Sequence, residues 1–314
     1  MDGCGAERSG ARCCEGRELT SRQPLRRLIK TSCHPGLLGL PGRWAGRKIG
    51  YRLRYGPRII IDNPAEYMQS EILRSGVYER RVAEVILAVG KPGDLMLDVG
   101  ANMGQHSLIA AWHGLRVHAF EPLPRLALRL KANLALNRLE ERVSVFESAV
   151  SSVEGSATLH EMDRADDGSH SLLASETVRQ QRDVEVRTVT IDGHLKAHSC
   201  GSPAIIKIDV EGAEALVLDG AKQTLHAPEA PVVLLETGHH SASVLGETAD
   251  TVLNRLLKMG YRVFEIDDGC AYCEELPRPA VWPGSRDYVA VPAGSERIEA
   301  VLNKLHGWYS AKAV

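Results

Sequence analysis

The 314-residue sequence contains no apolar run that approaches the roughly 18–20 residues needed to span a membrane. Its first residues also lack the uninterrupted apolar stretch that forms the core of a secretory signal peptide. These two absences argue against a membrane-spanning or secreted protein. We therefore expect a soluble, intracellular protein, located in the cytoplasm.

Cysteine is scarce: there are seven residues, and four of them lie within the first 33 positions. An odd and clustered set does not predict a disulfide framework. Cys270 and Cys273 form a C-x-x-C pair, but no second pair of ligands follows at the spacing of a structural zinc site. We predict reduced thiols and no bound metal.

The net charge of −2 is small, but the charges are unevenly distributed. Residues 1–58 hold 13 Lys and Arg against 4 Asp and Glu, which leaves 25 against 36 in the remainder. A basic leader could contact nucleic acid, an anionic membrane surface or the acidic body of the protein itself. Because Gly, Ser, Arg and Cys dominate its first 23 residues without periodicity, we expect a poorly ordered leader over residues 1–57.

The rest of the chain alternates apolar strands with helix-period segments, which is typical of a parallel α/β sheet. A strand at 59–61 and a helix at 78–89 form an N-terminal extension over residues 58–93. Extended pieces at 157–160 and 184–191 flank a polar loop. Residues 94–292 form the main domain, and 293–314 a C-terminal helix. We predict seven strands, at residues 95–99, 116–120, 143–146, 204–208, 232–235, 261–266 and 288–291. The expected helices are at 104–113, 124–136, 214–225, 248–259 and 296–305.

A glycine-containing loop follows the first of the seven strands. It begins at Asp98, contains Gly100 and Asn102, and ends at Gly104, where a helix starts. Glycines let the backbone approach a ligand closely, and the start of a helix offers free N–H groups. The G-x-G-x-x-G triplet of a pyrophosphate site is absent, and a preceding carboxylate suits the cationic end of S-adenosylmethionine better. We expect all four residues to bind that cofactor.

The next two strands supply further cofactor candidates. Glu121 ends the second strand, where a carboxylate can accept hydrogen bonds from both ribose hydroxyls, as in dinucleotide-binding folds. Ser148 and Ala149 end the third strand and are candidates for the adenine wall. A plain strand end is the alternative interpretation for that pair.

Three motifs together resemble the FkbM-type methyltransferases. They are Asp98-Val-Gly-Ala-Asn-Met-Gly104, Ala119-Phe-Glu121-Pro122 and Ile206-Lys-Ile-Asp209-Val-Glu-Gly-Ala-Glu214. The resemblance covers about residues 58–292. It implies a class I methyltransferase, with a Rossmann-like, seven-stranded, mostly parallel sheet and helices on both faces. It also implies S-adenosylmethionine as methyl donor and a hydroxyl on a small molecule, glycan or polyketide as acceptor.

The candidate catalytic residues are Asp209, Glu211, Glu236 and His239, which follow the fourth and fifth strands. Ligands bind beyond the carboxyl ends of parallel strands, so these groups should face the cleft that holds the donor. Asp209 and Glu211 are candidates for positioning the acceptor or taking its proton, and His239 for the general base. Helix capping and a solvated loop are the structural alternatives. A metal site built from Asp209, Glu236 and His239 is a further alternative, and Lys207 is expected to pair with Asp209 or Glu236.

Three other functions remain open. A nucleic-acid methyltransferase could use the basic leader, but the acidic body and the absence of an N-P-P-Y-like motif argue against it. A cofactor-binding protein without turnover is the second, and an NAD-dependent oxidoreductase the third. We expect Asp98→Ala or Gly100→Val to abolish cofactor binding with the fold intact. The sequence predicts neither the acceptor nor the oligomeric state.

Overall fold

The computed structural model describes residues 49–162, 181–237, 249–266 and 286–310. Within them, a central sheet has the strand order β11-β12-β10-β9-β3-β4-β5. All its strands are parallel except β12, which runs antiparallel to both of its neighbours. The strands are β3 (Leu95–Val99), β4 (Arg116–Phe120), β5 (Val143–Phe146), β9 (Ile205–Ile208), β10 (Val232–Thr237), β11 (Tyr261–Glu265) and β12 (Arg286–Pro292).

This arrangement confirms the predicted class I methyltransferase fold, including all seven strands. The strands were predictable because each carries a short apolar run, as expected of strands that are covered on both faces. Every residue of β3 and β9 is buried. The fourth predicted strand, β9, lies directly beside the first, β3, so the loops that follow them are neighbours.

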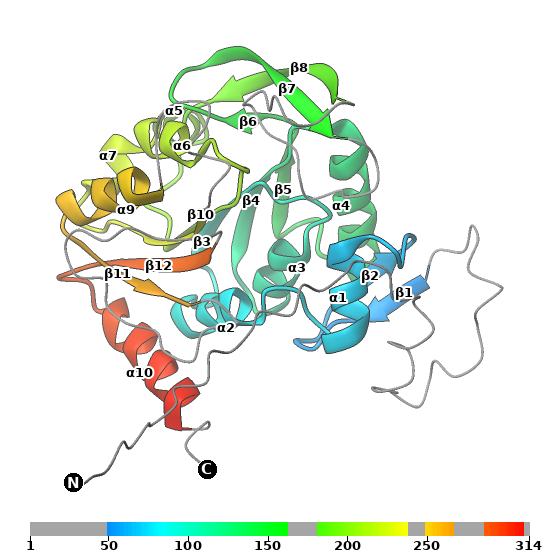
Figure 1. Cartoon of the computed structure of the whole chain (residues 1–314), viewed down its shortest axis with the longest axis horizontal. Helices are drawn as coiled ribbons and strands as arrows, with labels where there is room; N and C mark the ends of the chain where they lie inside the picture. The colour runs from blue at the N-terminus through cyan, green and yellow to red at the C-terminus, as the bar shows by residue number, and fades with distance from the viewer. Residues whose placement is uncertain (1–48, 163–180, 238–248, 267–285, 311–314) are drawn as a thin grey trace, which may run out of the picture. The chain divides into compact units, whose positions relative to one another are not determined.

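Helices cover both faces of the sheet (Figure 1). Apolar residues of α5, α6 and α9 pack in one core with Leu97, Ile206 and Leu235 of the sheet. On the other face, α3 contacts β3 and β4, α2 packs on α3, and α10 packs on α2. The helices are α1 (Tyr67–Ser75), α2 (Arg80–Val89), α3 (Gln105–Trp112), α4 (Pro124–Asn137), α5 (Ile191–Ala197), α6 (Glu214–Asp219), α7 (Lys222–Leu225), α9 (Ala249–Lys258) and α10 (Arg297–Ser310).

Two smaller sheets accompany the central one. The hairpin of β1 (Ile49–Arg52) and β2 (Arg58–Ile61) precedes it, and β1 lies in the segment that the sequence assigns to the leader. A three-stranded sheet has the order β6-β8-β7, from β6 (Ala149–Val150), β7 (Gly155–Met162) and β8 (Gln181–Val189). Within the residues described, none of the helices is both long enough and apolar enough to cross a membrane.

Two local predictions were wrong. The extended piece predicted to reach residue 191 ends at Val189, because the Thr190 hydroxyl accepts a hydrogen bond from the Gly193 N–H and starts α5. The helix predicted over 214–225 is two helices, with a break at Gly220. Asp192 causes a new start there, since its carboxylate caps α7 by accepting hydrogen bonds from the N–H groups of Gln223 and Thr224.

Cys200 is a free cysteine, as predicted. The other cysteines lie outside the described residues, and the prediction that they are reduced stays untested.

Candidate functional site

The loop between β3 and α3 has a backbone that only certain residues can adopt. Gly100, Asn102 and Gly104 all have positive φ angles, of 82°, 50° and 89°. A side chain on Gly100 would place its Cβ 1.7 Å from the backbone oxygen of Asp209. The loop between β3 and α3, residues 98–104, is called the donor loop below. It is therefore in backbone contact with the loop after β9. The expectation that Gly100→Val leaves the fold intact is wrong, because the added side chain must displace this contact.

Glu121 holds the donor loop from the end of β4. Its carboxylate accepts hydrogen bonds from the N–H of Asn102, at 2.9 Å, and from the N–H of Leu123, at 2.9 Å. Burial raises the pKa of Glu121 to about 7, and the two N–H donors oppose that rise. Each carboxylate oxygen has a second lone pair, so the group can still accept hydrogen bonds from a ligand.

Asp98 and Gly104 do not line the pocket that opens at the carboxyl ends of the central strands and is described below. Asp98 is only 1% exposed, and its Oδ2 accepts a hydrogen bond of 2.6 Å from the Ser107 hydroxyl. Its Oδ1 has no hydrogen-bond partner among the described residues. Gly104 caps the start of α3. The structure therefore places these two residues behind the loop, and Gly100 and Asn102 at its surface.

A pocket opens at the carboxyl ends of β3, β4, β9 and β10, and measures about 760 Å³ when space open to solvent is included. Of the predicted cofactor residues, Gly100, Asn102, Glu121, Ser148 and Ala149 line it. These five residues form what we call the donor side of the pocket. It is completed by apolar residues that the sequence did not single out: Val99, Phe120, Leu126, Val150 and Leu159.

The other side of the pocket is acidic. Asp209, Glu211 and Glu236 line it, as the sequence predicts. His239 lies outside the described residues. Lys207 forms the predicted ion pair with Asp209, at 2.8 Å between Nζ and Oδ2. Burial lowers the pKa of Lys207, but Asp209, Glu79 and Asp98 more than offset it, so the lysine stays protonated.

Two residues of the N-terminal extension also line the pocket, Met68 on α1 and Tyr78 just before α2. Gln105, at the start of α3, fixes the main chain of Tyr78: its side chain accepts from the Tyr78 N–H and donates to the Tyr78 carbonyl. Nothing in the sequence indicated a role for these residues, because residues 67–78 carry no recognisable motif.

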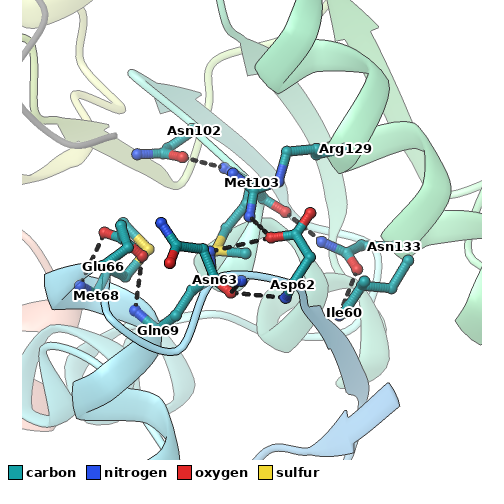
Figure 2. Close-up of polar contacts among 10 residues, drawn as sticks. All are labelled: Ile60, Asp62, Asn63, Glu66, Met68, Gln69, Asn102, Met103, Arg129 and Asn133. Carbon is teal, nitrogen blue, oxygen red and sulfur yellow. Dashed lines mark hydrogen bonds and ion pairs between the residues drawn. The ribbon is translucent and has the colours of Figure 1, made fainter. Parts of the chain in front are cut away.

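The extension is fastened to the donor loop through one buried side chain, shown in Figure 2. Asn133 of α4 accepts a hydrogen bond from the Ile60 N–H, at 2.7 Å, and donates one to the Met103 carbonyl, at 2.8 Å. Asn133 has no exposed surface. A second link joins Arg129 of the same helix to Asp62, at 2.5 Å.

The residues at the donor side fit S-adenosylmethionine. Glu121 can accept hydrogen bonds from ribose hydroxyls, and the apolar lining residues, together with Ser148 and Ala149, can contact adenine. The acidic groups that line the other side of the pocket, Asp209, Glu211 and Glu236, favour the cationic methionine end.

Comparison with known proteins gives one family. Residues 98–263, more than half of the chain, match the family model described as methyltransferase FkbM domain. Tyr78, which precedes α2, and Asp287, which lies on β12, fall outside that match.

Two curated relatives carry names that state a substrate. The hexuronic acid methyltransferase AglP of Haloferax volcanii is 27% identical over 184 residues, which cover 59% of this chain and 72% of AglP. The 31-O-demethyl-FK506 methyltransferase FkbM of Streptomyces tacrolimicus is 28% identical over 186 residues, covering 50% of this chain and 69% of that protein. Among solved structures, an S-adenosylmethionine-dependent methyltransferase from Agrobacterium tumefaciens matches with a TM-score of 0.45 and 13% identity, over 81% of this chain and 72% of that one.

Proposed function

Because the chain belongs to the methyltransferase FkbM domain family, whose members transfer a methyl group from S-adenosylmethionine, we propose that it methylates a hydroxyl oxygen of a small molecule, sugar or polyketide-like acceptor. The observation that carries the proposal is the set of residues that line the pocket. Its donor side, with Glu121, and its acidic side, with Asp209 and Glu236, share one opening.

The two curated relatives support an oxygen acceptor. The name of AglP specifies a hexuronic acid, and the name of FkbM specifies an oxygen of FK506. A sugar and a polyketide have hydroxyl groups in common. We therefore place the acceptor of this chain in the class of small hydroxyl compounds.

On the donor side, the chain binds and orients S-adenosylmethionine. Glu121 accepts hydrogen bonds from the ribose hydroxyls. The backbone of Gly100 and Asn102 borders the bound S-adenosylmethionine, and Ser148 and Ala149 contact its adenine. Bound S-adenosylmethionine supplies a methyl carbon whose bond to sulfur breaks, with the electron pair left on sulfur, as the acceptor oxygen bonds to that carbon. Holding the two reactants in line accounts for much of the expected acceleration.

On the acceptor side, the chain positions a hydroxyl and removes its proton. Asp209, Glu211 and Glu236 offer carboxylate oxygens at the pocket wall, and His239 remains a candidate general base. Lys207 stabilises the charge of Asp209 through their ion pair. Positioned acid–base groups typically contribute about 10²- to 10⁴-fold to a rate.

The experiment is to incubate the protein with a cell extract and S-adenosylmethionine that carries a labelled methyl group, and to identify the labelled product. We expect a small molecule with a new O-methyl group. Glu236→Gln should lower labelling at least about 100-fold, and the exposed control Glu140→Gln should not. Label found on nucleic acid, or on nitrogen or carbon, would contradict the proposal. Donor binding without any labelled product would indicate a non-catalytic protein.

A further inference from the structure

Three carboxylates meet beside the pocket, from segments far apart in the sequence. Glu236 of β10 and Asp287 of β12 are directly opposite each other in the antiparallel register. Glu79, at the N-terminus of α2, completes the group. One carboxylate oxygen of each lies within 4.8 Å of the other two. Directly opposed like charges destabilise a strand pair, so this group cannot be fully ionised without cost.

The charges that face Glu79 do not balance it. They come from its own loop, from α3 and from strands β9, β10 and β12: Tyr78, His106, Lys207, Asp209, Glu236 and Asp287. Lys207 is the cation of this set, and its ammonium is already bonded to Asp209. His106 lies 3.7 Å from Glu79, but burial keeps the pKa of His106 well below its ordinary value, so that ring is neutral near pH 7.

Shared protons are the consequence of this imbalance. Burial raises the pKa of Glu79 to about 8, with Asp209 and Glu236 adding to the rise and Lys207 opposing it. Burial and the neighbouring carboxylates also raise the pKa of Asp287 well above its ordinary value. Carboxyl groups that are packed this closely titrate as one unit and hold protons at neutral pH.

Of the three carboxylates, Glu236 reaches the pocket. It lines the pocket wall with Asp209 and Tyr78, whereas Glu79 and Asp287 are not among the lining residues. The Glu79 side chain is only 8% exposed. The cluster therefore has one member that can touch an acceptor and two that act through it.

We propose that Glu236 is the catalytic residue that removes the acceptor proton, and that Glu79 and Asp287 are positioning residues that share protons with it. The inference rests on the proposed function. As the acceptor oxygen forms its bond to the methyl carbon, its hydrogen moves as a proton to an ionised Glu236 oxygen, and the oxygen keeps the O–H electron pair.

The first test needs no acceptor: urea unfolding of the full chain at about pH 6 and about pH 9, with EDTA present. The folded chain keeps a proton on Glu79 up to about pH 8, whereas the unfolded chain releases it near 4.5. The unfolding free energy should therefore fall as pH rises through that window. In Glu79→Gln the fall in urea midpoint should shrink to about half, and in the exposed control Glu140→Gln it should equal that of the wild type.

An equal fall in wild type and Glu79→Gln would overturn the shared-proton cluster. A divalent cation is the competing occupant, and Mg²⁺ in place of EDTA tests for it. If Mg²⁺ raises the midpoint of the wild type at high pH but not that of Glu79→Gln, the cluster holds a cation and the proposal fails.

The second test uses the acceptor identified by methyl labelling. The kcat profile of the wild type should inflect near pH 8, where Glu79 releases its proton beside Glu236, and Glu79→Gln should lose that inflection. The KM for S-adenosylmethionine should not change. A lower kcat with an unmoved pH profile would mean a purely structural role. A wild type that transfers no methyl group would contradict the proposed function, and the unfolding test would still decide the shared protons.

Discussion

The two sides of the pocket are built in different ways. The donor side comes from consecutive strand ends, with Gly100, Asn102 and Glu121 within a short stretch of chain. Its contacts are mainly hydrogen bonds between backbone N–H groups and one carboxylate. The acidic side has Asp209 and Glu236 at the pocket. Lys207, Glu79 and Asp287 pack against them from other segments, so the contacts here are between ionisable side chains.

This difference separates binding from chemistry. A donor common to the whole family can be held by backbone geometry, which depends little on side-chain identity. The acidic side has to suit one acceptor and one proton transfer, and residues before and after the family module contribute to it. We therefore expect substitutions on the acidic side to alter charge balance, and substitutions on the donor side to alter affinity.

The largest effect should follow from removing the cation of the acidic side. Lys207→Met removes a buried ammonium and leaves the half-buried Asp209 without its partner. We expect a loss of up to about 3–5 kcal/mol of unfolding free energy, the figure for a fully buried pair. Urea unfolding measures the loss. The exposed pair of Lys131 and Glu147 provides the control, and Lys131→Met should cost less than about 1 kcal/mol. Equal losses would mean that the acidic side is no more sensitive to charge than the surface.

A smaller loss should follow at the joint between the extension and the donor loop. Asn133→Ala leaves the Ile60 N–H and the Met103 carbonyl without their partner, at about 1–3 kcal/mol for each buried group that stays unsatisfied. Asn137 is a matched control, since it makes two similar bonds to the backbone of Arg58 at an exposed position. Thermal unfolding compares the two variants. If Asn137→Ala were the more destabilising change, the joint would not depend on Asn133.

The smallest effect concerns donor affinity. Glu121→Gln removes the charge that we propose accepts hydrogen bonds from the ribose hydroxyls. A bond to a charged group is worth about 1.5–3 kcal/mol, or roughly 10- to 100-fold in Kd. With a pKa of about 7, Glu121 ionises as pH rises, so wild-type affinity should increase roughly tenfold from about pH 6 to about pH 8. Calorimetry with S-adenosylmethionine checks both values. The affinity of the variant should be flat with pH, and a flat wild type would remove Glu121 from the ribose contact.

The sequence predicted the central sheet well, because buried parallel strands are written as short apolar runs. It also predicted that Lys207 pairs with Asp209 or Glu236, since a lysine inside such a strand needs a carboxylate nearby, and the structure pairs it with Asp209. It missed α5, which begins where the Gly193 N–H donates to the Thr190 hydroxyl. It also missed the break at Gly220, where the fold brings the Thr224 N–H to the Asp192 carboxylate.

The site divides along the same line. Gly100, Asn102 and Glu121 belong to motifs with fixed spacing, so their place at the pocket could be anticipated. Glu79 and Asp287 belong to no motif, and only the packing of α2 and the register of β12 bring them to Glu236. Asp98 was expected at the ligand and lies behind the loop, because spacing along the chain does not show which way a strand residue faces.

The backbone contact between Gly100 and Asp209 also bears on how this protein can change over evolutionary time. The atom that excludes a side chain at position 100 is a main-chain oxygen, so no replacement of the Asp209 side chain can make room for one. A saturation library should therefore accept only glycine at position 100, whatever residue stands at 209. The acidic side of the pocket can therefore change its side chains, while the path of its backbone stays tied to the donor loop.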